Sequence, residues 1–182
     1  MKRLKPGLGV LAIVALGSLA GCSSNTRRAE NVSGGIRTSL DQAGLKDVSV
    51  KEDVDKGVVT LGGHVAADAD KTQAETIAKS MAGPQVVSDE IAVIPAGDAH
   101  EAKKVNSDLD KGIEGNLDAA LLQGGLHKKV NYAVKNQVVT LTGEVDSPTK
   151  RAQAQTIASA VPNVQQVVNE LQIKDLKATS SN

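Results

Sequence analysis

Residues whose types could do chemistry are few in this 182-residue chain, and their spacing does not suit catalysis. His64, His100 and His127 are far apart in the sequence, and none has a cysteine or a second histidine at the spacing of a zinc site. In the second copy of an internal repeat, the position of His64 holds Glu144. The histidines are therefore interpreted as exposed side chains and not as metal ligands.

Three carboxylates, Glu52, Asp53 and Asp55, lie close together on one expected strand and turn. Their spacing is not that of a calcium loop, and the second repeat copy has no acidic residues at the matching positions. A charged hairpin edge, which discourages pairing with another chain, explains them better. No nucleophile motif or phosphate-binding glycine loop occurs in the chain. The sequence thus predicts a protein that is not an enzyme and has no catalytic residues, cofactor or metal.

The lone cysteine of the chain, Cys22, ends an N-terminal segment with the features of a signal peptide. Three basic residues among the first five precede an uncharged run, Leu8–Ala20, which as a helix would be about 20 Å long and too short to span a bilayer. The run ends Leu19-Ala20-Gly21-Cys22, which resembles the lipobox of bacterial lipoproteins. This resemblance implies that residues 1–21 are removed and that Cys22 carries fatty acyl chains such as palmitate. The alternative is an ordinary secretory signal cleaved near Gly21.

The composition excludes several classes of ligand. Basic and acidic residues are balanced at 21 each, and aromatic residues make up 1% of the chain, with no Trp and no Phe. A nucleic-acid-binding protein would be strongly basic or would offer aromatic stacking platforms, and quaternary ammonium ligands need aromatic cages. We therefore expect no nucleic-acid partner and a core built from aliphatic side chains.

An internal repeat at an offset of 80 residues organises the rest of the chain. From Val50 to Val93, 16 of 44 positions are identical to the position 80 residues later. The strongest matches pair Val58–Val65 with Val138–Val145, and Gln73–Ala78 with Gln153–Ala158. Upstream, Ile36 and Leu40 match Ile113 and Leu117 at an offset of 77. This change of offset predicts three extra residues near Gln123 in the second copy.

Each copy is predicted to fold as helix, strand, strand, helix, strand. Ser147 and Pro148 have the types favoured at the N-cap and first position of the second helix in copy 2. A strand-helix-strand step gives a parallel right-handed crossover, so we expect an α+β fold with a three-stranded mixed sheet and two helices on one face. The expected segments are a tether at 22–29, modules at 30–95 and 105–175, a linker at 96–104 and a tail at 176–182. Modules of this size are marginally stable alone, so we expect them to pack on each other or on a partner.

The repeated pattern resembles the BON domain, a family named after bacterial osmotically inducible and nodulation proteins. The resemblance rests on a strand Val-x-Leu-x-Gly-x-Val, a helix with Ala-x-x-Ile-Ala and a closing Glu-Leu/Ile strand, and it covers Arg28–Pro95 and Val105–Lys174. Gly63 and Gly143 match the family's glycine after the second strand. With a lipobox, the chain is similar to dual-BON lipoproteins. That similarity implies an outer-membrane anchor facing the periplasm, phospholipid binding and a role in envelope integrity or osmotic stress tolerance.

The two copies differ in charge, and this difference selects a candidate site. From Leu121 onward the chain has seven basic and four acidic residues, whereas Thr26–Pro95 has eight and eleven. The family resemblance implies that the second helix of the second module contacts anionic phospholipid, so Thr149, Lys150 and Arg151 are the candidate contacts. The narrow apolar stripe of that helix is interpreted as core. A solvated first helical turn, and a chaperone-like module that binds envelope proteins, are the alternatives for the site and for the function.

Overall fold

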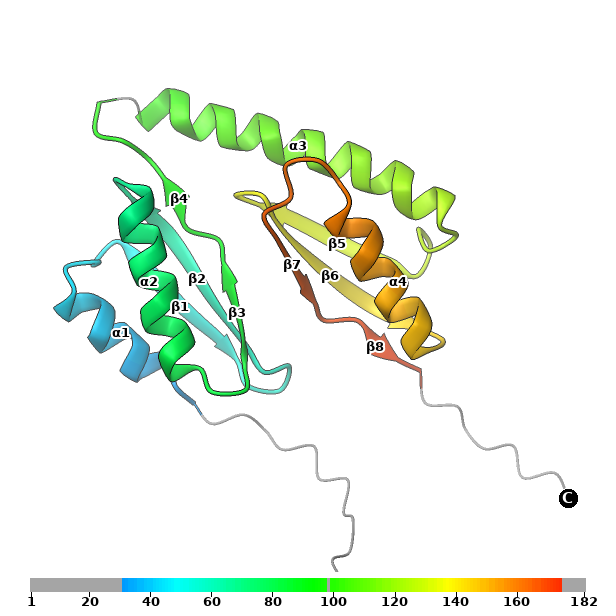
Figure 1. The fold of residues 1–182 in the computed structure, drawn as a ribbon, viewed down its shortest axis with the longest axis horizontal. Helices are drawn as coiled ribbons and strands as arrows, with labels where there is room; N and C mark the ends of the chain where they lie inside the picture. The colour runs from blue at the N-terminus through cyan, green and yellow to red at the C-terminus, as the bar shows by residue number, and fades with distance from the viewer. Residues whose placement is uncertain (1–30, 98, 175–182) are drawn as a thin grey trace, which may run out of the picture.

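The computed structural model describes residues 31–97 and 99–174 (Figure 1). The predicted signal peptide, Cys22, the tether and the tail at 176–182 lie outside the described residues. Two modules of the same architecture follow one another along the chain and lie side by side.

The first module contains two helices and one sheet, in the order that the sequence predicts. Its elements are α1 (Ser33–Gln42), β1 (Val48–Asp53), β2 (Val58–Val65), α2 (Asp68–Met81), β3 (Val86–Asp89) and β4 (Ala92–Val93). The central strand β2 pairs with β1 antiparallel and with both β3 and β4 parallel. Both helices pack on one face of this sheet (Figure 1).

The second module repeats this topology. Its elements are α3 (Ala99–Gln123), β5 (Val130–Lys135), β6 (Val138–Val145), α4 (Pro148–Ser159), β7 (Gln166–Asn169) and β8 (Gln172–Ile173). The predicted α+β fold with two tandem modules is confirmed, and the third strand of each sheet is present as two short segments. Helix α3 begins at Ala99, so the last six of the nine residues expected as a linker, 99–104, are helical.

In each module the third strand is interrupted where a side chain accepts a hydrogen bond from the backbone N–H two residues further along the chain. Asp89 Oδ1 accepts a hydrogen bond from the Ile91 N–H at 3.1 Å, and Asn169 Oδ1 accepts one from the Leu171 N–H at 3.2 Å. Asp and Asn favour such local bonds, which compete with the sheet ladder. The short break between the two segments of the strand therefore has the same cause in both modules.

Each module has its own aliphatic core, as the composition predicts. Ile36, Leu40 and Leu61 are fully buried in the first module, and Leu117 and Leu141 are fully buried in the second. The second helix of each module contributes small residues to the core, namely Ala74 and Ala78 in α2, and Ala154 and Ala158 in α4. Their small side chains let these helices approach the sheet closely.

The sheet register corrects the alignment of the two copies in the first strand. Leu61 and Leu141 are equivalent, and Leu61 lies opposite Val50 while Leu141 lies opposite Tyr132. Tyr132 therefore corresponds to Val50, and not to Glu52 as the constant offset of 80 predicted. The reason is the hairpin turn, which has four residues between Asp53 and Val58 and two between Lys135 and Val138.

The first helices also align differently from the prediction. Leu45 donates its N–H to the Leu40 carbonyl, and Leu126 donates its N–H to the Leu121 carbonyl, both at 2.9 Å. Leu40 therefore corresponds to Leu121 and not to Leu117. The expected three-residue insertion near Gln123 is wrong. The second copy has one more residue between its first helix and first strand and two fewer in its hairpin turn.

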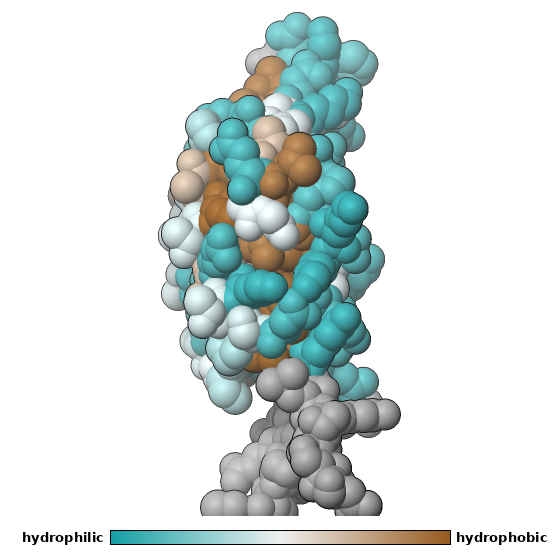
Figure 2. Space-filling view, turned by 90° about the vertical axis from the view of Figure 1, so that its right-hand side faces the viewer, coloured by the Kyte–Doolittle hydropathy of each residue, from teal (hydrophilic) through white to brown (hydrophobic). Residues whose placement is uncertain are grey.

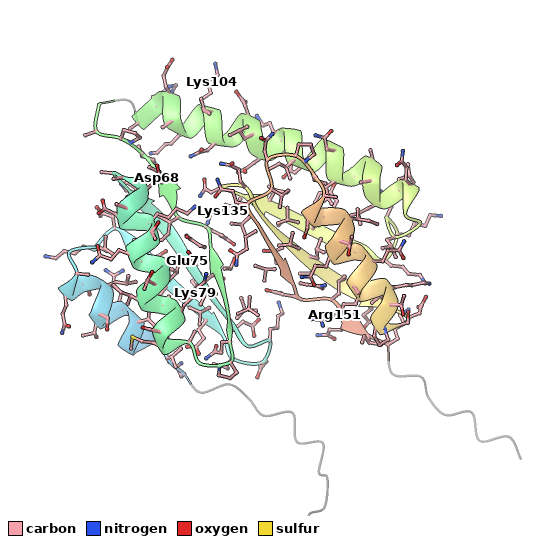
Figure 3. The ribbon with its side chains drawn as sticks, in the orientation of Figure 1. Asp68, Glu75, Lys79, Lys104, Lys135 and Arg151 are labelled. Atoms are coloured by element: carbon pink, nitrogen blue, oxygen red, sulfur yellow. The ribbon has the colours of Figure 1, made fainter. Side chains whose placement is uncertain are left out.

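The two modules pack on each other through strands β3 and β7 and the hairpin turns beside them. Lys56 of module 1 pairs with Glu170 of module 2 at 2.7 Å, and Lys135 of module 2 pairs with Glu90 of module 1 at 3.0 Å. Figure 3 shows Lys135 between the modules. Three valines, Val58, Val138 and Val168, form a separate buried cluster at this junction. The expectation of mutual packing therefore holds within one chain.

Candidate functional site

The candidate lipid contact lies at the start of α4, where the sequence sets the helix boundary. The Ser147 hydroxyl accepts a hydrogen bond from the Lys150 N–H at 3.3 Å, and Pro148 is the first helical residue, as predicted. The inward face of α4 carries the fully buried Ala154 and Ala158. The apolar stripe of this helix is thus part of the core, which leaves the charged first turn at the surface.

Lys150 belongs to a cluster of two lysines around one carboxylate. The Asp146 carboxylate pairs with Lys150 at 2.9 Å and also with Lys129, which precedes β5. The hydrogen bonds from Lys129 and Lys150 lower the pKa of Asp146 to about 2. Asp146 therefore stays ionised under all ordinary conditions, and the cluster keeps one net positive charge on a half-exposed surface.

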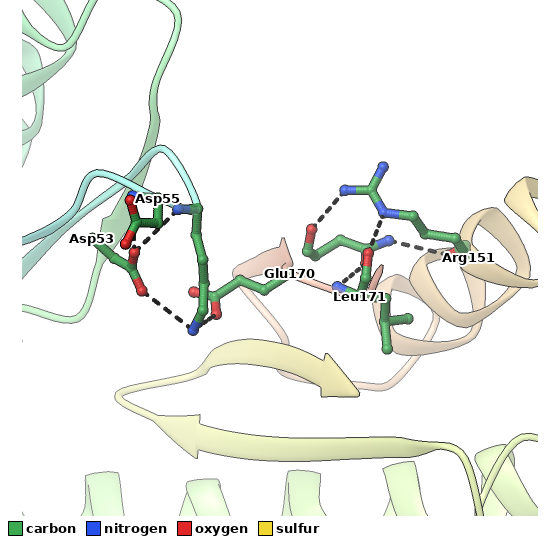
Figure 4. A network of polar contacts seen from close by, with 7 residues as sticks. Asp53, Asp55, Arg151, Glu170 and Leu171 are labelled. Carbon is green, nitrogen blue, oxygen red and sulfur yellow. Dashed lines mark hydrogen bonds and ion pairs between the residues drawn. The ribbon is translucent and has the colours of Figure 1, made fainter. Parts of the chain in front are cut away.

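Arg151 has a different environment from Lys150. Its guanidinium donates hydrogen bonds to the Leu171 carbonyl at 3.0 Å and to the Asn169 carbonyl at 2.8 Å. These bonds hold α4 against the turn between β7 and β8, next to Glu170, which pairs with Lys56 of module 1 (Figure 4). Arg151 is thus occupied by backbone acceptors, while Thr149 is exposed beside it.

The corrected alignment shows that this corner is reversed in charge between the modules. The carbonyls of Asp47 and Lys129 occupy the same place, each facing a glycine of the neighbouring strand, so Lys129 replaces Asp47. Lys150 replaces Asp70 at the start of the second helix. Two lysines in module 2 thus stand where module 1 has two aspartates. Inspection of the sequence missed the partnership of Lys129 with Asp146, because only the correct register reveals it.

In the part of module 2 that the structure describes, no large apolar face lies beside the lysines. The outward positions toward the C-terminal end of α4 are small or polar: Ala152, Gln155, Thr156, Ser159 and the C-cap residue Ala160. Figure 2 views the end of the molecule at the right of Figure 1, where apolar surface is broken up by hydrophilic residues. Three large apolar side chains of α3 and β8 remain exposed: Val105 and Leu122 in α3, at 57% and 65%, and Ile173 in β8, at 42%. A contact made here would depend on charge more than on insertion of apolar side chains.

His127 and Glu52, two of the residues that could do chemistry, have structural partners. His127 pairs with Asp118 at 2.8 Å, and Asp118 also accepts a hydrogen bond from the Tyr132 hydroxyl at 3.2 Å. Glu52 is not simply a charged edge residue, because it accepts hydrogen bonds from the N–H groups of Val32 and Ser33 at the start of α1. Within residues 31–97 and 99–174, no group of three or more His, Cys, Asp or Glu side chains could hold a metal ion.

Gly63 and Gly143 lie within β2 and β6, and not after the second strand as expected, because these strands extend to Val65 and Val145. Both glycines have a backbone conformation that favours glycine. Their φ angles are +91° and +114°. A Cβ atom at Gly63 would collide with the Asp47 carbonyl oxygen, and one at Gly143 would lie 2.5 Å from the Lys129 carbonyl oxygen. Both glycines therefore allow the loop before the first strand to cross close to the second strand.

The fold defines a class of protein, a tandem pair of small α+β modules. Among the described residues of both modules, no group of side chains is arranged to hold a metal ion. The BON domain family model matches residues 29–95 and 109–175, and the chain belongs to the BON domain family. This confirms the resemblance read from the sequence.

Known proteins resemble the chain to different degrees. The osmotically-inducible protein Y of Escherichia coli (strain K12) is 31% identical over 137 residues, which cover 74% of this chain and 67% of that protein. A structure of CdsD, a structural protein of the type III secretion system of Chlamydia trachomatis, covers 76% of this chain and 90% of its own at 14% identity, with a TM-score of 0.34. The C-terminal domain of CdsD covers 78% and 66% at 12% identity, with a TM-score of 0.30.

Proposed function

We propose that this chain is a non-enzymatic envelope lipoprotein, anchored in the outer membrane through Cys22 and facing the periplasm. Its second module would bind anionic phospholipid and so support outer-membrane integrity under osmotic stress. The name of the Escherichia coli relative, an osmotically inducible protein, agrees with a role in osmotic stress. Among the described helices, none combines the length and the hydropathy of a membrane span. The proposed anchor is the acyl group on Cys22.

The observation that carries the lipid-binding proposal is the reversal of charge at the start of α4. Lys129 and Lys150 flank Asp146 at a surface where module 1 carries Asp47 and Asp70. A lysine near an anionic membrane surface contributes about 1 kcal/mol of attraction. Because Arg151 is engaged with backbone carbonyls, we assign the contact to Lys150 and Lys129, with Thr149 beside them. Arg151 holds α4 in place.

Exchange of the two lysines for the residues of module 1 tests this proposal. Lys129→Asp combined with Lys150→Asp should weaken binding to vesicles containing phosphatidylglycerol about tenfold or more, because two attractive charges become repulsive. Flotation of the acyl-free chain from Ser23 onward measures the binding. Asp146→Asn should strengthen binding several-fold, since it leaves both lysines without their carboxylate.

The matched control makes the same change of charge in module 1. Lys46 and Lys51 are exposed, and replacement of both by Asp should leave vesicle binding nearly unchanged. Binding should disappear at high salt and on phosphatidylcholine vesicles. If the Lys129 and Lys150 variant binds as the natural chain does, the site is wrong. If the natural chain ignores all vesicles but captures envelope proteins, the chaperone-like alternative replaces lipid binding.

The proposed anchor has its own test. Cells fed a radioactive fatty acid should incorporate label into the natural chain and not into Cys22→Ala, because acylation requires the thiol. The Cys22→Ala protein should move from the membrane fraction to the soluble fraction, since stable anchoring needs the acyl chains. Ser23→Ala should keep both the label and the membrane location. Equal labelling of all three chains would refute the anchor.

A further inference from the structure

The contact between the modules has an approximate two-fold symmetry. A lysine from the hairpin of each module pairs with the glutamate that follows the third strand of the other, in the pairs Lys56–Glu170 and Lys135–Glu90. Val58 and Val138 are equivalent residues and are buried in the same small cluster. In a contact of this kind, similar surfaces meet face to face, as they do in symmetric dimers.

Module 1 contributes the poorer half of this contact. Val168 of module 2 is buried in the valine cluster, whereas its equivalent, Ser88, is 1% exposed and its hydroxyl has no hydrogen-bond partner among the described residues. A buried hydroxyl without a partner costs free energy. The valine side chain at position 168 avoids this cost.

A glutamine of module 2 makes two hydrogen bonds across the contact, and module 1 has no equivalent side chain that could make them in the other direction. Gln166 Oε1 accepts a hydrogen bond from the Asp89 N–H at 2.9 Å, and Gln166 Nε2 donates one to the Val87 carbonyl at 2.6 Å. The side-chain amide thus pairs with the edge of β3 as a neighbouring strand would. The equivalent residue of module 1 is Val86, which is 48% exposed and has no polar atoms in its side chain.

We infer that this face of module 2 is a docking surface for the same face of a second copy of this chain, and that module 1 covers it within one chain. Two copies of module 2 would place two Gln166 amides, two Lys135–Glu170 ion pairs and four valines in the contact. The existing contact has one such glutamine, two ion pairs and three valines. The module 2 surface therefore matches itself better than it matches module 1.

The short connection between the modules keeps the contact within one chain. Module 1 ends after β4 at Val93, and α3 begins at Ala99. A short connection raises the effective concentration of the attached module to about the millimolar range. The natural chain should therefore be a monomer at micromolar concentration, and release of module 1 should expose the docking surface.

A pair of equivalent variants tests the inference on the chain from Ser23 onward. Val58→Asp with Glu90→Lys damages only the module 1 face, whereas Val138→Asp with Glu170→Lys damages only the module 2 face. Both variants should separate the modules, because each places an aspartate in the valine cluster and reverses one charge of an ion pair. Neither changes the main cores, because Val58 and Val138 belong to the junction cluster. Circular dichroism checks that both variants are folded, and light scattering after gel filtration gives their mass.

The first variant should dimerise, and the second should need about tenfold higher concentration or more to do so. Addition of Val168→Asp to the first variant should restore the monomer, because it damages the exposed module 2 face. A monomeric first variant would overturn the inference. Equal dimerisation of both variants, or a dimer that survives Val168→Asp, would also overturn it. Lipid binding plays no part in this experiment.

Discussion

Gly63→Ala should destabilise module 1 by about 3 kcal/mol or more. The residue has a φ of +91°, which costs an alanine about 1–2 kcal/mol, and the new Cβ would also collide with the carbonyl oxygen of Asp47. That oxygen belongs to a backbone segment held by the antiparallel pairing of Val48 with Gly63. The strand and the loop must therefore move apart, because the collision is with a backbone atom and no side-chain rotation can relieve it.

The matched control is Gly44→Ala, which separates the two causes. Gly44 has a φ of +82°, but nothing lies within 4 Å of its ideal Cβ position. Gly44→Ala should therefore cost only the conformational term, about 1–2 kcal/mol. Urea unfolding followed by circular dichroism measures both variants. Equal losses for the two alanines would show that the contact with the Asp47 carbonyl has no energetic weight.

The fold could be predicted because two patterns agree along the chain. The helical stripe and the strand alternation occur twice in the same order, and the start of α4 carries Ser147 and Pro148 as cap residues. A hydrophobic pattern fixes which face of an element is buried. It does not fix how far the element extends, which is why α3 begins at Ala99, inside a segment without apolar periodicity.

The errors in the alignment have a physical cause. The first helix was misaligned by four residues and the first strand by two. A helix presents nearly the same face after four residues, as Ile113, Leu117 and Leu121 show, and a strand presents the same face after two. These shifts preserve the burial pattern, so the sequence alone could not detect them. Hydrogen bonds and strand register detect them at once.

The candidate site was predictable only in part, for the same reason. Lys150 could be found from the charge of its helix, but the second lysine of the cluster, Lys129, directly precedes the first strand, whose alignment was wrong. Arg151 carries the same charge as Lys150 and differs through its acceptors, which are backbone carbonyls. Carbonyl acceptors have no signature in a sequence, so the two roles could not be told apart.

Asp89→Asn should stabilise the protein by about 1–2 kcal/mol at neutral pH, and the equivalent exchange Asn169→Asp should destabilise it. The side chain of Asn169 donates hydrogen bonds to the Arg151 carbonyl at 3.1 Å and to Gln155 Oε1 at 3.2 Å. Asp89 is 6% exposed, and its side chain has no N–H group to donate. The residue of module 1 that corresponds to Gln155 is Glu75. An asparagine at position 89 could make both bonds, whereas an aspartate at position 169 would lose both.

The gain in stability from Asp89→Asn should depend on pH, and the pKa of Asp89 gives the direction of that dependence. Burial raises the pKa of Asp89 above its usual value, Lys71 and Lys79 oppose this, and Glu75 adds to it. A carboxyl group whose pKa is raised by folding keeps its proton in the folded state after the unfolded chain has lost it. Stability from this group is therefore present below the ordinary Asp pKa and is lost as the pH rises through the raised pKa.

Other carboxylates change the stability of the protein with pH in the opposite direction. The quantity to measure is therefore the difference in the free energy of unfolding between Asp89→Asn and the natural chain. Hydrogen bonds lower the pKa values of Glu52 and Asp146. The contribution of these two groups to the stability of the folded protein is therefore lost as the pH falls. The advantage of Asp89→Asn over the natural chain should be largest at neutral pH and should shrink in acid near the ordinary carboxyl pKa. Urea unfolding of both proteins across this range measures it. An advantage that is independent of pH would mean that the buried charge of Asp89 has no influence on stability, and that hydrogen bonding alone distinguishes the two modules at this position.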